Sequence, residues 1–152
     1  MRILVFTDSH GRTDYLELAL LMHPEADLIV HLGDYERDME DMSVFTGGKR
    51  VVRVCGNCDY ASALPANELL TCGGKRILCT HGYMEYVKHG EEALIAKAAD
   101  VRADIVLYGH THQSVNRYED GLYIFNPGAM CDRCFGVVDI TPGGIICIPM
   151  EV

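Results

Sequence analysis

Tyr108-Gly109-His110-Thr111-His112 is the stretch on which the prediction of the fold rests, and it follows directly on a short apolar run. Its two imidazoles are one residue apart, a spacing that points them away from each other on a helix and would spoil the core on a half-buried strand. The preceding glycine allows a tight backbone turn that brings both rings toward one point. His-x-His alone is more often two unrelated surface histidines. Here the pattern indicates a metal site, because four other apolar runs also end in potential metal ligands.

These runs are predicted to be β-strands, and a ligand-type side chain follows each one. In open α/β sheets, functional groups gather at the carboxyl ends of the strands, so parallel neighbours would bring such side chains to one rim. The residues are Asp8 and His10 after residues 3–6, Asp34 after 27–32, Asn57 after 50–54, His81 after 76–80, and His110 and His112 after 104–107.

The first third of the chain alternates strands and helices, which predicts a parallel sheet with right-handed crossovers. A helix is expected to begin with Thr13 as its N-cap and to end at Pro24. An acidic helix is expected over residues 36–43. The apolar face of the first helix is predicted from the 3.6-residue period as Tyr15, Leu18, Ala19 and Met22.

The remainder of the chain contains mostly hairpins. Residues 68–71 and 76–80 flank a turn, a helix is expected over 91–101, and the tail is predicted to contain only short strands. These tail strands are 115–118 and 122–125, joined through Asp120-Gly121, and 135–140 and 145–148, joined through Pro142-Gly143-Gly144. With no internal repeat or linker, residues 1–152 are predicted to form a single α/β domain with two sheets.

The composition limits the class of protein. The chain has 152 residues, of which 49% are hydrophobic and 23% charged, as in one ordinary globular domain. Its apolar runs are too short to span a membrane, and the opening run is too short for the core of a signal peptide, so we expect a cytoplasmic protein. The net charge of −9 argues against a duplex nucleic acid partner. Bound divalent cations would still allow a small anionic substrate.

The seven cysteines are an odd number and are expected to be reduced thiols. Two pairs, Cys55/Cys58 and Cys131/Cys134, have Cys-x-x-Cys spacing, but they lie more than 70 residues apart, unlike a zinc ribbon. Buried or loop thiols are therefore favoured over a structural zinc site, and the role of the two pairs stays open.

The types of candidate ligand indicate which ions would bind. Carboxylate, imidazole and carboxamide groups without thiolate suit Mn²⁺, Fe²⁺, Co²⁺, Ni²⁺ or Zn²⁺. Seven groups are too many for one ion with an open coordination position, and they fit two ions that share one carboxylate. Such a pair of ions would lower the pKa of a bridging water and hold the oxygens of a phosphate.

The motifs Asp-x-His, Gly-Asp, Gly-Asn-x-Asp, His-Gly and Gly-His-x-His occur here in the order that resembles the calcineurin-like metallophosphoesterase superfamily. The small size and the sequence Gly56-Asn57-Cys58-Asp59 resemble its compact bacterial and archaeal phosphodiesterases. The resemblance extends over residues 2–148. It implies a four-layer α/β/β/α sandwich, in agreement with the parallel section followed by hairpins.

The resemblance also implies roles for individual residues. Asp34 would bridge the two ions, and a metal-bridging hydroxide would attack phosphorus in line, without a phosphoenzyme. Asp34, Asn57, His81 and His110 are thereby the expected catalytic residues, and the two ions are expected to be Mn²⁺, with Ni²⁺, Co²⁺, Fe²⁺ or Zn²⁺ as alternatives. The first ion would be held by Asp8, His10 and His112, and the second by Asn57, His81 and His110.

Some positions depart from the family pattern. Cys58 stands where many larger members have a histidine that assists the leaving group, which predicts modest rates and a preference for good leaving groups. Tyr83 replaces a frequent second histidine, and Ala129 a frequent serine. His31, within the second strand, is interpreted as a structural histidine. Asp59 is expected either to orient a neighbour or to cap the surface, and Arg12 and Arg133 remain open as phosphate contacts.

The sequence therefore predicts a metal-dependent phosphodiesterase that acts on a small or nucleotide-like phosphoester. Two alternatives remain open. A phosphomonoesterase or nucleotide pyrophosphatase would use the same centre, and a non-catalytic scaffold of the same fold would bind other proteins, as the retromer subunit that resembles this family does. All seven ligand positions are filled, which favours an enzyme. Association into a homo-oligomer through the tail strands also stays open.

Overall fold

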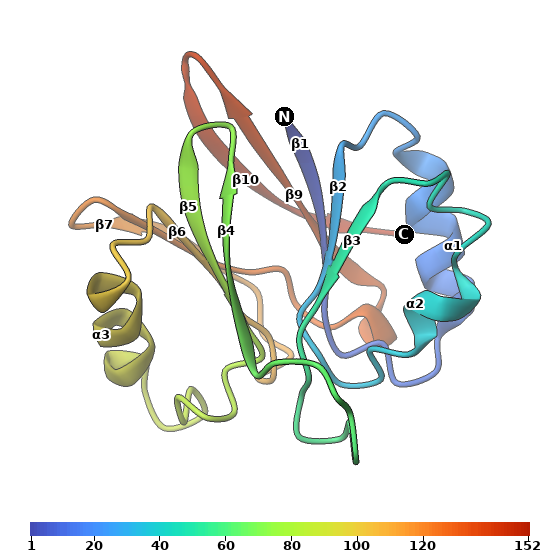
Figure 1. Cartoon of the computed structure of the whole chain (residues 1–152), viewed down its shortest axis with the longest axis horizontal. Helices are drawn as coiled ribbons and strands as arrows, with labels where there is room; N and C mark the ends of the chain where they lie inside the picture. The colour runs from blue at the N-terminus through green and yellow to red at the C-terminus, as the bar shows by residue number, and fades with distance from the viewer.

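The computed structural model describes the whole chain, residues 1–152. Two five-stranded sheets pack face to face, and helices cover their outer faces (Figure 1). The first sheet has the order β10 (Gly144–Glu151), β9 (Cys134–Thr141), β1 (Arg2–Phe6), β2 (Leu28–His31) and β3 (Arg50–Arg53). The second has the order β4 (Asn67–Cys72), β5 (Lys75–Thr80), β6 (Ile105–Leu107), β8 (Leu122–Asn126) and β7 (Val115–Glu119).

The strand directions follow from the connections. β1, β2 and β3 are parallel, as predicted, and the crossovers between them contain α1 (Thr13–Met22) and α2 (Asp38–Asp41). β9 pairs antiparallel with β1, and β10 with β9. In the second sheet β5, β6 and β8 are parallel, while β4 and β7 pair antiparallel at the two edges. The crossover from β5 to β6 contains α3 (Glu92–Asp100).

Three apolar clusters separate four layers. Because successive side chains of a strand point to opposite faces, Ile3 and Val5 of β1 face the second sheet, whereas Leu4 and Phe6 face α1. The third cluster joins the outer face of the second sheet to α3, through residues such as Leu94. Figure 1 shows α1 and α2 on one side of the two sheets and α3 on the other. The predicted four-layer α/β/β/α sandwich is confirmed.

The first helix differs from its prediction in two details. Thr13 is its first residue rather than its N-cap; Arg12 occupies the cap position and makes no side-chain capping bond. Of the predicted face, Ala19 is buried and Tyr15 packs against the core, but Leu18 and Met22 are about half exposed, and Leu16 and Leu20 are buried in their place. This helix is apolar on nearly every side, so its sequence period does not specify which side meets the sheet.

The acidic helix and the tail also differ from prediction. α2 is four residues long, because Tyr35 has a left-handed backbone (φ 65) before it and the chain continues after it in turns closed by short-range bonds, such as Ser43 N to Glu40 O at 3.3 Å. In the tail, β9 and β10 each have eight residues, and a 3₁₀ turn, η1 (Met130–Asp132), precedes them. The tail is therefore not made only of short strands.

No helix of this structure is long and apolar enough to cross a bilayer. All seven cysteines are free, as expected for reduced thiols. The predicted α3 and the hairpin turn at Asp120-Gly121 are found within a residue of their expected bounds.

Candidate metal centre

The five strand ends that carry ligand-type residues converge at one edge of the sandwich, the lower side in Figure 1. We call this the ligand edge: the carboxyl ends of β1, β2, β3, β5 and β6 and the loops that follow them. The two sheets are joined there by direct bonds. His81 Nδ1, after β5, lies 2.9 Å from the carbonyl oxygen of Leu32, after β2, and the N–H of His110 donates to Asp8 Oδ2 at 3.0 Å. All seven predicted site residues come together at this edge.

One cluster consists of Asp8, His10 and His112. Their candidate ligand atoms all lie within 4.8 Å of one another. His112 Nε2 is 3.1 Å and His10 Nε2 is 3.9 Å from the same oxygen, Asp8 Oδ1. The carboxylate is fully buried, whereas both imidazoles are about one third exposed. The cluster therefore has its negative charge at the bottom and opens to solvent on the histidine side.

A second cluster consists of Asp34, His81 and His110, again with candidate ligand atoms within 4.8 Å of one another. Asn57 belongs with them, since its Oδ1 is 3.1 Å from His81 Nε2. The two oxygens of Asp34 face different clusters: Oδ1 is 3.5 Å from His81 Nε2, and Oδ2 is 3.8 Å from His10 Nε2. This is the arrangement expected of a carboxylate that lies between two ions.

The geometry around His81 shows why these ligand atoms would bind a cation. Its Nδ1 faces the carbonyl of Leu32, so a proton lies on Nδ1, and in the neutral ring the lone pair on Nε2 points into the cluster. That lone pair faces Asn57 Oδ1 at 3.1 Å and Asp34 Oδ1 at 3.5 Å, both of which are also acceptors. Acceptor atoms that converge in this way require a cation or a proton between them.

The charges at the centre agree with this. Asp8 and Asp34 are buried, and their only charged partners within 4.0 Å are histidines, with no lysine or arginine. Burial opposes the charge of Asp34, but the positive charge that His81 has when protonated, together with the N–H of Cys58, outweighs it, so the pKa of Asp34 lies below its usual value. Burial, reinforced by His81 and Lys88, lowers the pKa of His110 to about 4. An ionised carboxylate and a neutral imidazole are the forms that bind metal.

Five of the seven site residues have a left-handed backbone, which is uncommon for residues other than glycine. The list is Asp8 (φ 53), His10 (φ 45), Asp34 (φ 59), His110 (φ 68) and His112 (φ 58). Each such conformation costs on the order of 1–3 kcal/mol and persists only when the surrounding structure imposes it. The strain is concentrated where the side chains must point at one place.

Gly109 has a different role from the one predicted. It does not provide the left-handed turn, which His110 and His112 adopt themselves. A Cβ on Gly109 would lie 1.9 Å from Thr7 Oγ1 and 2.8 Å from Asp8 Oδ2. Glycine is required because the loop after β6 passes directly against the end of β1.

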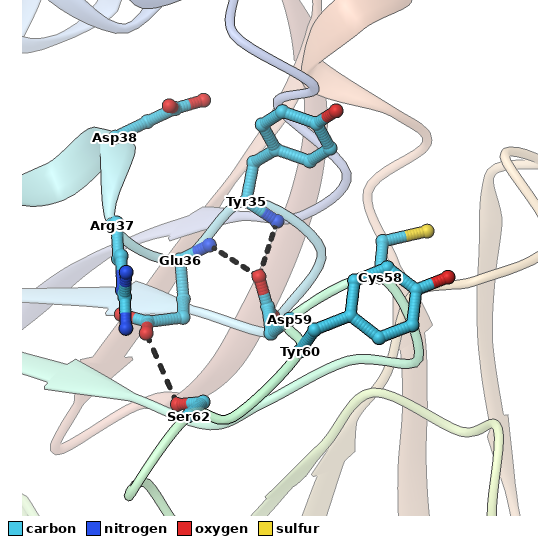
Figure 2. Close-up of a pocket in the computed structure, with 8 residues that line it drawn as sticks. All are labelled: Tyr35, Glu36, Arg37, Asp38, Cys58, Asp59, Tyr60 and Ser62. Atoms are coloured by element: carbon cyan, nitrogen blue, oxygen red, sulfur yellow. Dashed lines mark hydrogen bonds between the residues drawn. The ribbon is translucent and has the colours of Figure 1, made fainter.

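Asp59 holds the ligand edge together, although its sequence signal was weak. Its carboxylate accepts four backbone N–H bonds, from Asp34 at 2.8 Å, Tyr35 at 2.7 Å, Glu36 at 3.1 Å and Gly56 at 2.7 Å. Figure 2 shows the bonds from Tyr35 and Glu36. These bonds tie the loop after β2 to the loop after β3. Asp59 therefore caps these backbone groups and at the same time positions Asp34 relative to Asn57, in agreement with the interpretation that it orients a neighbour.

Two further residues stabilise the ligand edge. The role of Asn126 was not predicted, and that of His31 was predicted only in part. Asn126 is fully buried at the end of β8 and donates to the carbonyl of Gly109 at 3.0 Å, which fixes the loop that carries His110 and His112. His31 accepts the N–H of Gly33 at 3.2 Å and lies 3.1 Å from Ser9 Oγ. Burial lowers the pKa of His31 to about 4, so the ring is neutral, and the interpretation of a satisfied structural histidine agrees with this geometry.

The positions that depart from the family pattern border the centre. Cys58 Sγ lies within 4.8 Å of candidate ligand atoms of His10 and Asp34, and burial together with Asp34 raises the pKa of its thiol to about 11. The thiol is therefore neutral near pH 7. Arg12 pairs with Asp14 at 2.9 Å and Arg133 donates to the carbonyl of Val152 at 2.8 Å, so both are engaged away from the centre.

The sandwich and its two clusters define an α/β protein with a candidate divalent-metal centre. The family model described as the calcineurin-like phosphoesterase superfamily domain matches residues 1–141, and the chain belongs to this family. It is thus a member of a family of metal-dependent phosphoric ester hydrolases, as the order of its motifs predicts.

Individual relatives agree with this assignment. The probable metallophosphoesterase YsnB of Bacillus subtilis is 31% identical over 131 residues, which cover 86% of this chain and 75% of YsnB. The phosphodiesterase MJ0936 of Methanocaldococcus jannaschii is 21% identical over 155 residues, 92% of this chain and 90% of that protein. The structure of Vps29 from Entamoeba histolytica, complexed with Zn²⁺, has a TM-score of 0.75 at 20% identity and covers 99% of each chain.

Proposed function

We propose that this chain hydrolyses small phosphodiesters in the cytoplasm, with two divalent ions, Mn²⁺ by preference, held at the ligand edge. The observation that supports this most directly is Asp34, whose Oδ1 lies 3.5 Å from His81 of one cluster and whose Oδ2 lies 3.8 Å from His10 of the other. If the site bound a single ion, the ligand atoms of one cluster would bind no metal. The phosphodiesterase MJ0936 is a relative along nearly the whole chain.

In this proposal Asp8, His10 and His112 hold one ion, Asn57, His81 and His110 hold the other, and Asp34 lies between them. When bound, the ions would supply Lewis acidity that activates a water molecule and neutralises the charge of the phosphate. The residues of the chain fix where this takes place. Asp59 and the carbonyl of Leu32 orient Asp34 and His81, and the loop positions of His10 and His112 leave the solvent side open to a phosphate.

The position beside the centre that holds a histidine in larger members offers only a weak acid for the leaving group. Cys58 is the residue at that position, and burial together with Asp34 raises the pKa of its thiol to about 11 in the metal-free protein. A thiol of that pKa is a weak general acid. The proposal therefore includes a preference for esters whose leaving groups depart without protonation.

Hydrolysis of p-nitrophenyl esters by metal-stripped protein, before and after Mn²⁺ is restored, tests this function. We expect bis(p-nitrophenyl) phosphate to be cleaved only with Mn²⁺, and faster than p-nitrophenyl phosphate. Ca²⁺ at the same concentration is the matched control for charge, because it prefers all-oxygen sites. Titration of bound Mn²⁺ should reach two ions per chain.

Each outcome has a distinct meaning. Faster cleavage of the monoester would replace the diesterase proposal with a phosphomonoesterase. Saturation at one ion per chain would contradict the dinuclear centre. Binding of two ions without turnover of either ester would favour the protein-binding scaffold.

A further inference from the structure

Two pockets flank the candidate metal centre, one beside each cluster. The first, which we call the α2-side pocket, is lined by Tyr35, Cys58 and Tyr60 among others, and the second, the β5-side pocket, by Asn57, His81 and Tyr83 among others. Each has a volume of about 200 Å³. The adjacent residues Asn57 and Cys58 line one pocket each, so the tip of the loop after β3 lies between them.

Each pocket has a half-exposed tyrosine that contacts a histidine of the neighbouring cluster. The ring of Tyr35 lies 5.1 Å from that of His10, and the ring of Tyr83 lies 5.5 Å from that of His110 in an edge-on arrangement. Tyr35 is 47% exposed and Tyr83 is 51% exposed. Tyr60 adds an 85% exposed ring to the α2-side pocket. Aromatic surface left in water next to a polar centre is available for a ligand.

The carboxylates of the α2-side pocket are already engaged, which excludes a third cation site there. Glu36 pairs with Arg53 at 2.8 Å, and Asp38 accepts bonds from Ser9 at 2.7 Å and Gly11 at 2.8 Å. In Figure 2 the Asp38 carboxylate stands apart from Cys58 and the Tyr60 ring, and Ser62 donates to Glu36. The groups left for a ligand are the aromatic rings, the thiol of Cys58 and the exposed guanidinium of Arg37, which has no ion-pair partner.

The β5-side pocket has no charged lining residue other than a histidine of the centre. Thr80 uses its hydroxyl in a bond to the buried Glu85 at 3.0 Å, and Met84 exposes 64% of its surface beside Tyr83. An aromatic ring and a thioether at the edge of a metal centre suit an uncharged, flat or apolar group.

We propose that the two pockets receive the two organic arms of a phosphodiester, with Tyr35 and Tyr83 each packing against one aromatic arm while the phosphate lies between them. This inference rests on the proposed function and deepens it, because a monoester has only one organic arm and would leave one pocket without an occupant. It assigns the substrate class as diesters with an aromatic group, such as a base or an aryl ring, on each side.

Two diesters that differ in their number of aryl arms distinguish the roles of the two pockets. Bis(p-nitrophenyl) phosphate has two aryl arms, whereas methyl p-nitrophenyl phosphate has one. In both, the oxygen of water forms a bond to phosphorus, the phosphorus–oxygen bond to the nitrophenyl group breaks, its electron pair leaves on nitrophenolate, and the proton passes to solvent. In the methyl ester the aryl ring must occupy the leaving-group pocket, because methoxide is the poorer leaving group.

We therefore expect the two variants Tyr35→Ala and Tyr83→Ala to behave differently with the Mn²⁺-loaded protein. The variant in the leaving-group pocket should raise the KM of both diesters, because both place an aryl ring there. The variant in the other pocket should raise the KM of the bis-aryl ester alone. Each increase should be about three- to tenfold, the size of one aromatic contact. Tyr35→Phe and Tyr83→Phe retain the ring and should rescue these losses. Because Ala and Phe bear the same cost at the left-handed position 35 (φ 65), their comparison isolates the ring.

Tyr118→Ala serves as the remote control. Tyr118 is 62% exposed, but it pairs with Tyr123, which in turn pairs with Ile105 at the start of β6, far from the ligand edge. The Mn²⁺ content of every variant should equal that of wild type, which separates the binding of an arm from a loss of metal.

Equal effects of both alanine variants on both diesters, no effect of either, or an equal effect of Tyr118→Ala would overturn the inference while leaving the diesterase proposal intact. No turnover of either diester by the loaded wild-type protein would overturn the proposed function, and this inference with it.

Discussion

At the two ends of the sandwich, the left-handed backbone conformation is adopted by different types of residue. At the end with the hairpin turns, this conformation falls mainly on glycine, at Gly73, Gly74, Gly121 and Gly144, where it has little cost. At the ligand edge it falls not only on glycines such as Gly33 and Gly82 but also on two aspartates and three histidines, where it costs on the order of 1–3 kcal/mol for each residue. The hairpin turns need only the shape of the backbone, whereas the ligand edge needs both the shape and the side chain. Strain is retained where a side chain cannot be exchanged for glycine.

The largest expected effect comes from removing the charge between the two clusters. Asp34→Asn keeps the size and tolerates the left-handed backbone, so the fold should persist. We expect diester hydrolysis to fall by at least about 10³-fold, the upper range for loss of one preorganised charged or polar group, together with weaker retention of both ions. Hydrolysis rates and bound Mn²⁺ measure this.

The matched control makes the same change at the other end of the molecule. Asp120 is also left-handed (φ 49), but it lies in a hairpin turn. Asp120→Asn should leave rate and metal content at wild-type values. Wild-type turnover in Asp34→Asn would contradict the assignment of two ions.

The next largest expected effect is a loss of folding stability at low pH. His31 supports the ligand edge from within β2, and burial lowers its pKa to about 4, below the value of about 6.5 in the unfolded chain. The unfolded state therefore takes up the proton first as the pH falls. This contribution to stability is complete above pH 6.5 and is lost between about pH 6.5 and 4, by up to roughly 3 kcal/mol.

Urea unfolding of the metal-free protein between pH 7.5 and 4.5 measures this loss. His31→Gln is the matched variant, because its amide can accept from Gly33 and donate to Ser9 without titrating. Its stability should fall less steeply with acid than that of wild type. Parallel pH profiles would show that His31 is not responsible.

A smaller effect is expected at Asp59, which joins the loops after β2 and β3. Asp59→Asn replaces an oxygen that accepts backbone N–H bonds with an NH₂ group that cannot accept them. We expect a loss of about 1–3 kcal/mol in the free energy of unfolding and about 10- to 100-fold in metal affinity. Asp14→Asn, at an exposed carboxylate that pairs with Arg12, should change neither. If Mn²⁺ affinity is unchanged in Asp59→Asn, this residue does not position Asp34.

The smallest effect tests the strain itself. His112→Gly should abolish hydrolysis, yet the metal-free variant should gain roughly 1 kcal/mol in stability, because glycine adopts φ 58 without strain. Gly121→Ala in the hairpin turn (φ 88) should lose a similar amount, although nothing lies within 4 Å of the added carbon. Urea unfolding of both proteins provides the comparison. A loss of stability in metal-free His112→Gly would show that its contact with Asp8 outweighs the strain.

The sequence predicted β1, β2 and β6 well because each is a short apolar run that ends in a polar or glycine residue, and β-strand length matches such runs. It predicted the ligand edge for the same reason, since the run marks where each strand ends. It failed for the buried face of α1, because Leu16, Leu18, Leu20 and Leu21 surround the helix and the period is ambiguous. It also failed for the length of α2, because the turn at Tyr35 is imposed by Asp59, a residue 24 positions away.

The amino-acid sequence by itself thus determined the order of strands and helices and the seven residues of the candidate centre, because these depend on local patterns, whereas the four layers followed from the resemblance to a family. Only the tertiary structure decided what holds those residues in place. Asp59 and Asn126 act through backbone groups that are distant in sequence, and Gly109 is needed because another strand passes against it. The two pockets with Tyr35 and Tyr83 were decided in the same way, since their walls come from loops of different strands. Contacts between loops leave no periodic signal in a single sequence, because each partner needs only one suitable residue.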